Sequence, residues 1–182
     1  MKAPASVESR ERVRLFCALR LPRETVEAIV PWQHDALRGR LVEPGNLHVT
    51  LAFLGSRPAS DLAAVAAELR QAAARAVRPV LTVRGYRETR SVGMLTLDDR
   101  EGRGAALAAE LHGRLQALGV YEPEQRAWLA HLTVVRFRER PRLQPALPDL
   151  GEVCPSDAAV YHSVLRSSGA QYEVLDSVAL GG

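Results

Sequence analysis

The stretch Asn46-Leu47-His48-Val49-Thr50-Leu51 recurs in the second half of the chain as Ala130-His131-Leu132-Thr133-Val134-Val135. Both copies lie in apolar runs with β-branched residues, which is typical of strands. Side chains alternate between the two faces of a strand, so each histidine shares a face with the threonine two residues later. The sequence therefore predicts two strands, one in each half, that each present an imidazole beside a hydroxyl group.

The segments around these two strands carry alternating strand and helix patterns. In chain order we expect a strand over 13–21, a helix over 23–38, the first histidine strand, a helix over 60–76, strands over 80–83 and 92–97, a helix over 104–118, the second histidine strand, and a closing hairpin over 158–165 and 172–180. This order predicts an α+β fold with mainly antiparallel sheet. One histidine strand in each half also indicates an approximate internal duplication.

Length and composition predict a single domain over residues 1–182. The chain has 182 residues, of which 47% are hydrophobic, enough to bury a core. Two cysteines, Cys17 and Cys154, are too few for a disulfide framework, so we expect a reducing, cytoplasmic location. The first apolar stretch stops at Arg20, too early for a membrane span. Lys2 is the only lysine, so no phosphate-binding loop of the Gly-Lys-Ser/Thr type exists.

Two histidines and two threonines brought around one small group suit phosphodiester chemistry. Hydrolysis without a metal needs a base for water and an acid for the leaving oxygen, and histidine can serve as either because its usual pKa is about 6.5. His48 and His131 are the candidates for these roles, and the hydroxyls of Thr50 and Thr133 can donate to the developing negative charge. Arg136 would add a cationic fork, but strict alternation puts it on the face opposite His131, so this role needs a bulge, a strand end or a long reach.

Two other interpretations compete with paired catalysis. A histidine in an apolar strand is often a structural residue, so the residues alone leave both roles open. A metal site is disfavoured because neither motif has a carboxylate or a second histidine at ligand spacing, and we expect no metal or other cofactor.

Four segments in the same order resemble the two-histidine phosphoesterase superfamily, and most of all its RNA 2′,3′-cyclic phosphodiesterase branch, also called 2′-5′ RNA ligase. They are the opening strand 14–22, the first motif 44–55, the second motif 131–136 and the closing hairpin 160–165 with 169–172. The chain departs from this family at Leu41 and Gly45, where members often carry Trp and Glu. Phe53, Tyr86 and Trp128 are therefore the aromatic candidates for stacking on a base.

The resemblance implies a bilobal α+β fold, with two mainly antiparallel sheets flanked by helices around a central cleft and with approximate pseudo-symmetry. It further implies metal-independent hydrolysis of the 2′,3′-cyclic phosphate at RNA or oligonucleotide ends to a 2′-phosphate. His48 and His131 would be catalytic, and Thr50, Thr133 and Arg136 would bind the phosphate. A provisional assignment makes His131 the base and His48 the acid, and the reverse assignment stays open.

The same groups acting in reverse would join a 5′-hydroxyl to the cyclic phosphate, which is the ligase activity. The expected partners are RNA or oligonucleotide ends rather than a membrane or a metal, and we expect a monomer. Two alternatives remain: a phosphodiesterase for a small cyclic nucleotide or a 2′-5′ oligonucleotide, and a module that binds RNA ends without catalysis.

Overall fold

The computed structural model describes residues 11–167 and 169–181. Its α-helices and strands follow the expected order, and the short strand β2 and two short 3-10 helices, Pro44–Asn46 and Ala59–Asp61, are additions. The α-helices and strands are β1 (Arg12–Arg20), α1 (Arg23–Ala36), β2 (Arg40–Leu41), β3 (His48–Pro58), α2 (Leu62–Arg75), β4 (Thr82–Glu88), β5 (Val92–Asp98), α3 (Arg103–Ala117), β6 (His131–Arg136), β7 (Asp157–Arg166) and β8 (Gly169–Ala179). The predicted α+β class is confirmed. Within these ranges no helix is long and apolar enough to cross a membrane.

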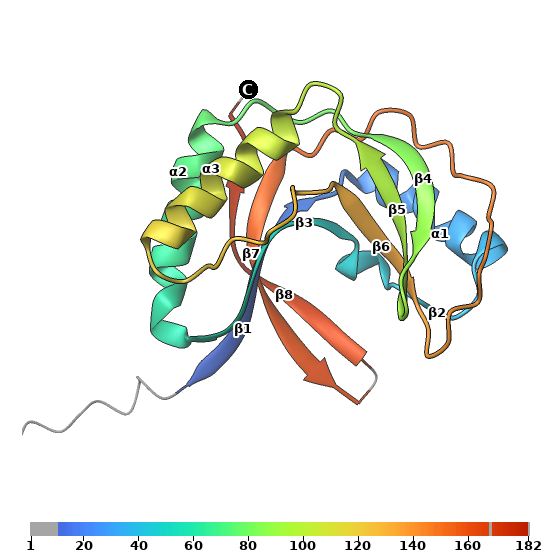
Figure 1. The fold of residues 1–182 in the computed structure, drawn as a ribbon, viewed down its shortest axis with the longest axis horizontal. Helices are drawn as coiled ribbons and strands as arrows, with labels where there is room; N and C mark the ends of the chain where they lie inside the picture. Colours follow the sequence, from blue (N-terminus) through green and yellow to red (C-terminus); the bar gives the residue numbers. More distant parts are fainter. Residues whose placement is uncertain (1–10, 168, 182) are drawn as a thin grey trace, which may run out of the picture.

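All eight strands belong to one curled antiparallel sheet (Figure 1). Its order is β4-β5-β6-β3-β1-β7-β8, and β2 pairs with β6. The two sheets that we expected are the two halves of this single sheet, β4-β5-β6 with β2 and β3-β1-β7-β8. The halves are joined through one residue pair, Val49 with Leu132. The two lobes are therefore two halves of one sheet that a single residue pair connects.

The helices cover one face of the sheet and leave the other face for the functional site. Helices α2 and α3 pack against each other and against β3, β7 and β8 (Figure 1). Helix α1 packs on the other half, where the Gln33 side chain donates to the carbonyls of Val42 (3.1 Å) and Val134 (2.7 Å). The helices thus cover both halves of the sheet, α2 and α3 on one half and α1 on the other.

The central strand β1 is buried on both faces. Leu15, Cys17 and Leu19 point into the main core, as their apolar alternation predicts. Phe16 and Ala18 point the other way, into a small aromatic cluster with Ala159, Tyr161 and Tyr172. This second cluster forms the floor beside the first histidine motif.

Candidate active site

The residue pair that joins the two halves of the sheet is also the centre of both repeated motifs. Val49 pairs with Leu132 in antiparallel fashion, and the two side chains are buried in the core. Because side chains alternate along a strand, the flanking residues of both motifs face the opposite side, with His48 beside Thr133 and Thr50 beside His131. The fold thus brings the four predicted side chains together around an approximate two-fold axis.

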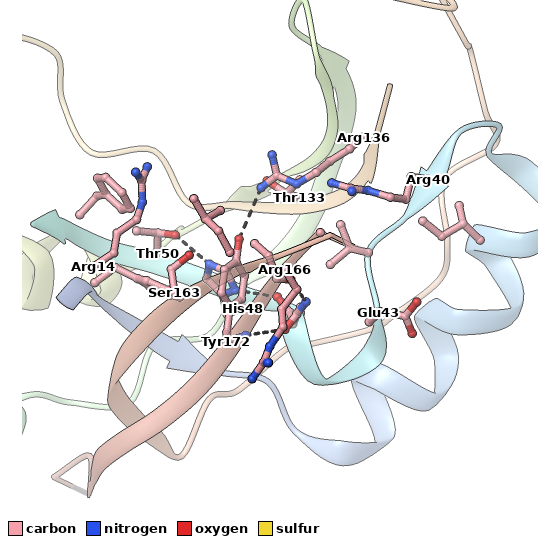
Figure 2. Close-up of a pocket in the computed structure, with 18 residues that line it drawn as sticks. Arg14, Arg40, Glu43, His48, Thr50, Thr133, Arg136, Ser163, Arg166 and Tyr172 are labelled. Carbon is pink, nitrogen blue, oxygen red and sulfur yellow. Dashed lines mark hydrogen bonds between the residues drawn. The ribbon is translucent and has the colours of Figure 1, made fainter. Parts of the chain in front are cut away.

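A β-bulge turns Arg136 toward the same side as the second motif. Met94 of β5 pairs with Thr133, and the adjacent residue Gly93 pairs with Val135. Val134 therefore has no partner on β5 and is the extra residue of the bulge. After this shift Arg136 faces the cavity that Thr133 lines (Figure 2). Of the three conditions under which Arg136 could face this side, a bulge, a strand end or a long reach, the structure has the bulge, and Arg136 is also the last residue of β6.

The first motif is followed by a matching bulge at Leu51, where the pairing with β1 shifts. Phe53 consequently faces the same side as Thr50, and the residue is 47% exposed. The guanidinium carbon of Arg14 lies 5.0 Å from the centre of this ring. The third residue after each threonine thus reaches the site, as Phe53 in one half and as Arg136 in the other.

The hydrogen bonds of His48 define its tautomer. Nδ1 lies 2.7 Å from the carbonyl oxygen of Asn46, and Nε2 lies 3.1 Å from Oγ1 of Thr50. A carbonyl only accepts, so Nδ1 carries the proton and donates it. In the neutral ring Nε2 then accepts the Thr50 hydroxyl and is the atom that can take up a proton.

Aromatic rings surround His48 and lower its pKa. The ring centre lies 4.9 Å from that of Phe16 and 5.3 Å from that of Tyr172, which stands edge-on. Loss of hydration among these groups is the main reason that the pKa of His48 falls to about 4, and the positive charges of His131 and Arg136 lower it further, against the Asn46 hydrogen bond. His48 is therefore uncharged at neutral pH.

His131 has the same backbone contact but a more open position. Its Nδ1 lies 2.9 Å from the carbonyl oxygen of Leu129, two residues earlier, as in the first motif. The side chain is partly exposed and lines a different cavity from His48. The two rings are thus held alike but meet different surroundings.

Two neighbouring cavities meet at the motifs. The larger, of about 520 Å³, is lined by His48, Thr133 and Arg136, and the smaller, of about 350 Å³, is lined by His131. Thr50 and Phe53 line both. A phosphate held over Thr50 would therefore have one imidazole on each side, which is the arrangement that an in-line displacement requires.

Asn46 connects this site to the β7–β8 hairpin, a role that the sequence did not reveal. Its side chain donates to the carbonyl of Ala170 (3.0 Å) and accepts from the backbone N–H of Tyr172 (3.2 Å). The Tyr172 hydroxyl in turn lies 3.5 Å from Nη2 of Arg136 (Figure 2). These contacts join the hairpin to the side of the larger cavity that His48 lines. The two Asn46 bonds join residues more than one hundred positions apart, so no local pattern indicates them.

The three aromatic candidates for base stacking have different positions. Phe53 lines both cavities, and Trp128 lines the smaller one while its Nε1 donates to the carbonyl of Thr50 (2.9 Å). Tyr86 lines neither cavity and hydrogen-bonds Glu88 (3.2 Å). In residues 11–167 and 169–181, no three His, Cys, Asp or Glu side chains are grouped so that they could hold a metal ion.

Comparison with known proteins agrees with this architecture. Residues 19–89 match the sequence family described as LigT like phosphoesterase. Escherichia coli LigT complexed with 3′-AMP is similar at 25% identity over 94% of this chain and 100% of that chain, with a TM-score of 0.77. TT0787 of Thermus thermophilus is similar at 29% identity over 93% of this chain and 98% of that chain, with a TM-score of 0.77.

A further crystal structure, described as a phosphoesterase, shares 27% identity over 94% of this chain and 100% of that chain, with a TM-score of 0.79. Escherichia coli LigT has also been crystallised with phosphate, ATP and NADP+. No curated protein matches the sequence significantly.

Proposed function

Because the chain belongs to the LigT-like phosphoesterase family, within the two-histidine superfamily, we propose that it hydrolyses the 2′,3′-cyclic phosphate at RNA or oligonucleotide ends to a 2′-phosphate. The observation that carries this proposal is the pairing of Val49 with Leu132. This one pair places a histidine and a threonine from each half around a common point. Nucleotide ligands bound to Escherichia coli LigT support a nucleotide substrate for this chain as well.

The surroundings of His48 favour it as the base, which is the assignment that the sequence left as the alternative. Its pKa of about 4 keeps the ring neutral at pH 7, and its tautomer makes Nε2 the ring nitrogen that can accept a proton. His131 then has the role of the acid. It is partly exposed, so it can regain a proton from solvent after each turnover.

The proposed step is a single displacement at phosphorus. His48 Nε2 takes a proton from a water molecule in the larger cavity, and the water oxygen bonds to phosphorus as the bond to the 3′-oxygen breaks. His131 gives its proton to that 3′-oxygen, and the 2′-phosphate remains. Thr133 and Arg136 donate to the other phosphate oxygens as negative charge develops on them, and Thr50 does so once its hydroxyl turns from Nε2 of His48 to the phosphate.

An RNA oligomer that ends in a 2′,3′-cyclic phosphate tests this proposal, with EDTA in excess. Wild type is compared with His48→Ala and His131→Ala, and with His34→Ala as a matched control because His34 is exposed on α1, outside both cavities. We expect a terminal 2′-phosphate from wild type and from His34→Ala, and a loss of about 10²- to 10⁴-fold in kcat for the other two. A 3′-phosphate product, or full activity of both site variants, would contradict the mechanism. Tight binding without turnover would favour an RNA-end binding module.

A further inference from the structure

The larger cavity carries more positive charge than one phosphate needs. Arg14, Arg40, Arg136 and Arg166 line it, and Glu43 is the one acidic residue among its described lining (Figure 2). Within residues 11–167 and 169–181, none of these four arginines forms an ion pair with a carboxylate. Like charges that line one cavity without ion-pair partners repel each other, so an anionic ligand is favoured there.

Arg40 is the immediate neighbour of the arginine that the proposed reaction uses. The two residues pair across β2 and β6, Arg40 with Arg136, so their side chains share a face of the sheet. The Arg40 guanidinium also reaches across the cavity to the β7–β8 turn. A Cβ on Gly169 would lie only 2.7 Å from its Nη1, so the missing side chain at Gly169 leaves the space that this guanidinium occupies.

Arg40 and Arg136 are neighbours on the sheet, but their side chains turn in different directions. Arg136 can turn back toward the motifs, as its contact with Tyr172 shows (3.5 Å), while Arg40 points to the hairpin turn. The two neighbouring guanidinium groups therefore face different parts of the cavity.

We propose that Arg40 binds a second phosphate group, next to the one that reacts. A guanidinium suits this ligand because its donors match two phosphate oxygens at once. The inference rests on the proposed function, because a nucleotide substrate carries such a group at a neighbouring position. The second phosphate belongs either to the 5′ side of the terminal nucleotide or to a second strand that enters the larger cavity. In both cases the Arg40 guanidinium donates hydrogen bonds to phosphate oxygens.

The first arm of the test compares adenosine 2′,3′-cyclic phosphate with the same compound carrying a 5′-phosphate. We measure kcat/KM at low salt for wild type, Arg40→Gln and the matched control Arg75→Gln, whose arginine is exposed at the end of α2, outside the cavity. If the phosphate is on the same nucleotide, wild type and Arg75→Gln prefer the 5′-phosphorylated compound by about 10- to 100-fold, the range of a charged hydrogen bond. In Arg40→Gln the preference falls to near one.

The second arm adds a short strand that cannot react at its 3′ end, the dinucleotide ApA, with adenosine as its phosphate-free counterpart. If the second phosphate comes from an incoming strand, ApA slows hydrolysis or is joined to the cyclic phosphate, adenosine does neither, and Arg40→Gln abolishes the effect. Equal behaviour of wild type and Arg40→Gln in both arms would overturn the proposal.

A binding measurement separates failure of this inference from failure of the proposed function. Calorimetry compares adenosine 2′,5′-bisphosphate with adenosine 2′-phosphate, and ApA with adenosine. If no cyclic phosphate is turned over, the proposed function fails, whereas a preference for the additional phosphate that disappears in Arg40→Gln still supports the subsite. Absence of that preference from wild type for both pairs of compounds would refute it.

Discussion

Removing the ring of Tyr172 is expected to raise the pKa of His48 and to move the acidic limb of the pH–rate profile to higher pH. Burial is the main reason that this pKa lies at about 4, and the Tyr172 ring centre is 5.3 Å from that of His48. Tyr172→Ala opens one side of the enclosure to water, which stabilises the charged imidazole. A base acts only when neutral, so activity is lost as pH falls through the pKa of the folded protein.

The size of the effect follows from the fraction of neutral His48. At pH 5 a group of pKa about 4 is about 90% neutral, whereas an imidazole with the usual pKa of about 6.5 is only about 3% neutral. Complete loss of the shielding would therefore lower kcat/KM at pH 5 by about 30-fold. Tyr172 is one of several rings around His48, and half of the shift would give about 2.5-fold. At pH 8 the neutral fraction of His48 is close to one in wild type and in Tyr172→Ala, so the shift in the His48 pKa does not change kcat/KM there.

The assay is kcat/KM for adenosine 2′,3′-cyclic phosphate between pH 4 and 8.5, together with an NMR titration of the His48 ring. Tyr172→Phe is the control, because it keeps the ring and removes only the hydroxyl. We expect its acidic limb to coincide with that of wild type. A wild-type limb near pH 6.5, or a limb that Tyr172→Ala leaves in place, would refute the argument that ring shielding keeps His48 neutral.

Three further predictions concern stability and the closure of the site. Asn46→Ala removes two hydrogen bonds to the β7–β8 hairpin and should lower the free energy of unfolding in urea by about 1–3 kcal/mol and reduce kcat; an unchanged kcat would show that the hairpin does not position the site. Glu88 is buried and accepts from the backbone N–H groups of Arg142 and Leu143, so Glu88→Ala should cost about 1–3 kcal/mol in thermal unfolding, and Glu88→Gln, which keeps one acceptor, should cost less. The unfolded state binds more protons at His48 than the folded state between pH 4 and 6.5, so stability should rise with pH across that window, and His48→Asn should weaken the rise in urea titrations.

The two histidine–threonine pairs of the site could be predicted from the sequence, because each pair depends only on the alternation of side chains along one strand. His48 and Thr50 share a face, as do His131 and Thr133, since each pair is separated by one residue of a strand. Alternation alone places Arg136 on the face opposite His131. It therefore indicates that a bulge would be needed to turn Arg136 to the same side, but only the structure shows that the bulge exists. Local periodicity thus predicts which side chains lie together within a strand.

Periodicity does not give the register between strands that are far apart in the chain. The pairing of Val49 with Leu132 joins residues more than eighty positions apart, and β2 has two residues, too few for any pattern. Arg40 was therefore missed, because its position follows entirely from the β2–β6 pairing. The separation of the site into two cavities was missed for the same reason, since it depends on how the two halves of the sheet curl.

The approximate symmetry of the two motifs makes their differences meaningful. Both histidines donate Nδ1–H to the carbonyl two residues earlier, and both motifs continue into a bulge. Two histidines with the same pKa would hold one neutral base and one charged acid in at most about a quarter of the molecules at any pH. The rings around His48 break this equivalence on one side of the axis only. Phe53 and Arg136, at matching positions, break it again, so the two ends of the site differ and would orient the proposed nucleotide substrate in one direction.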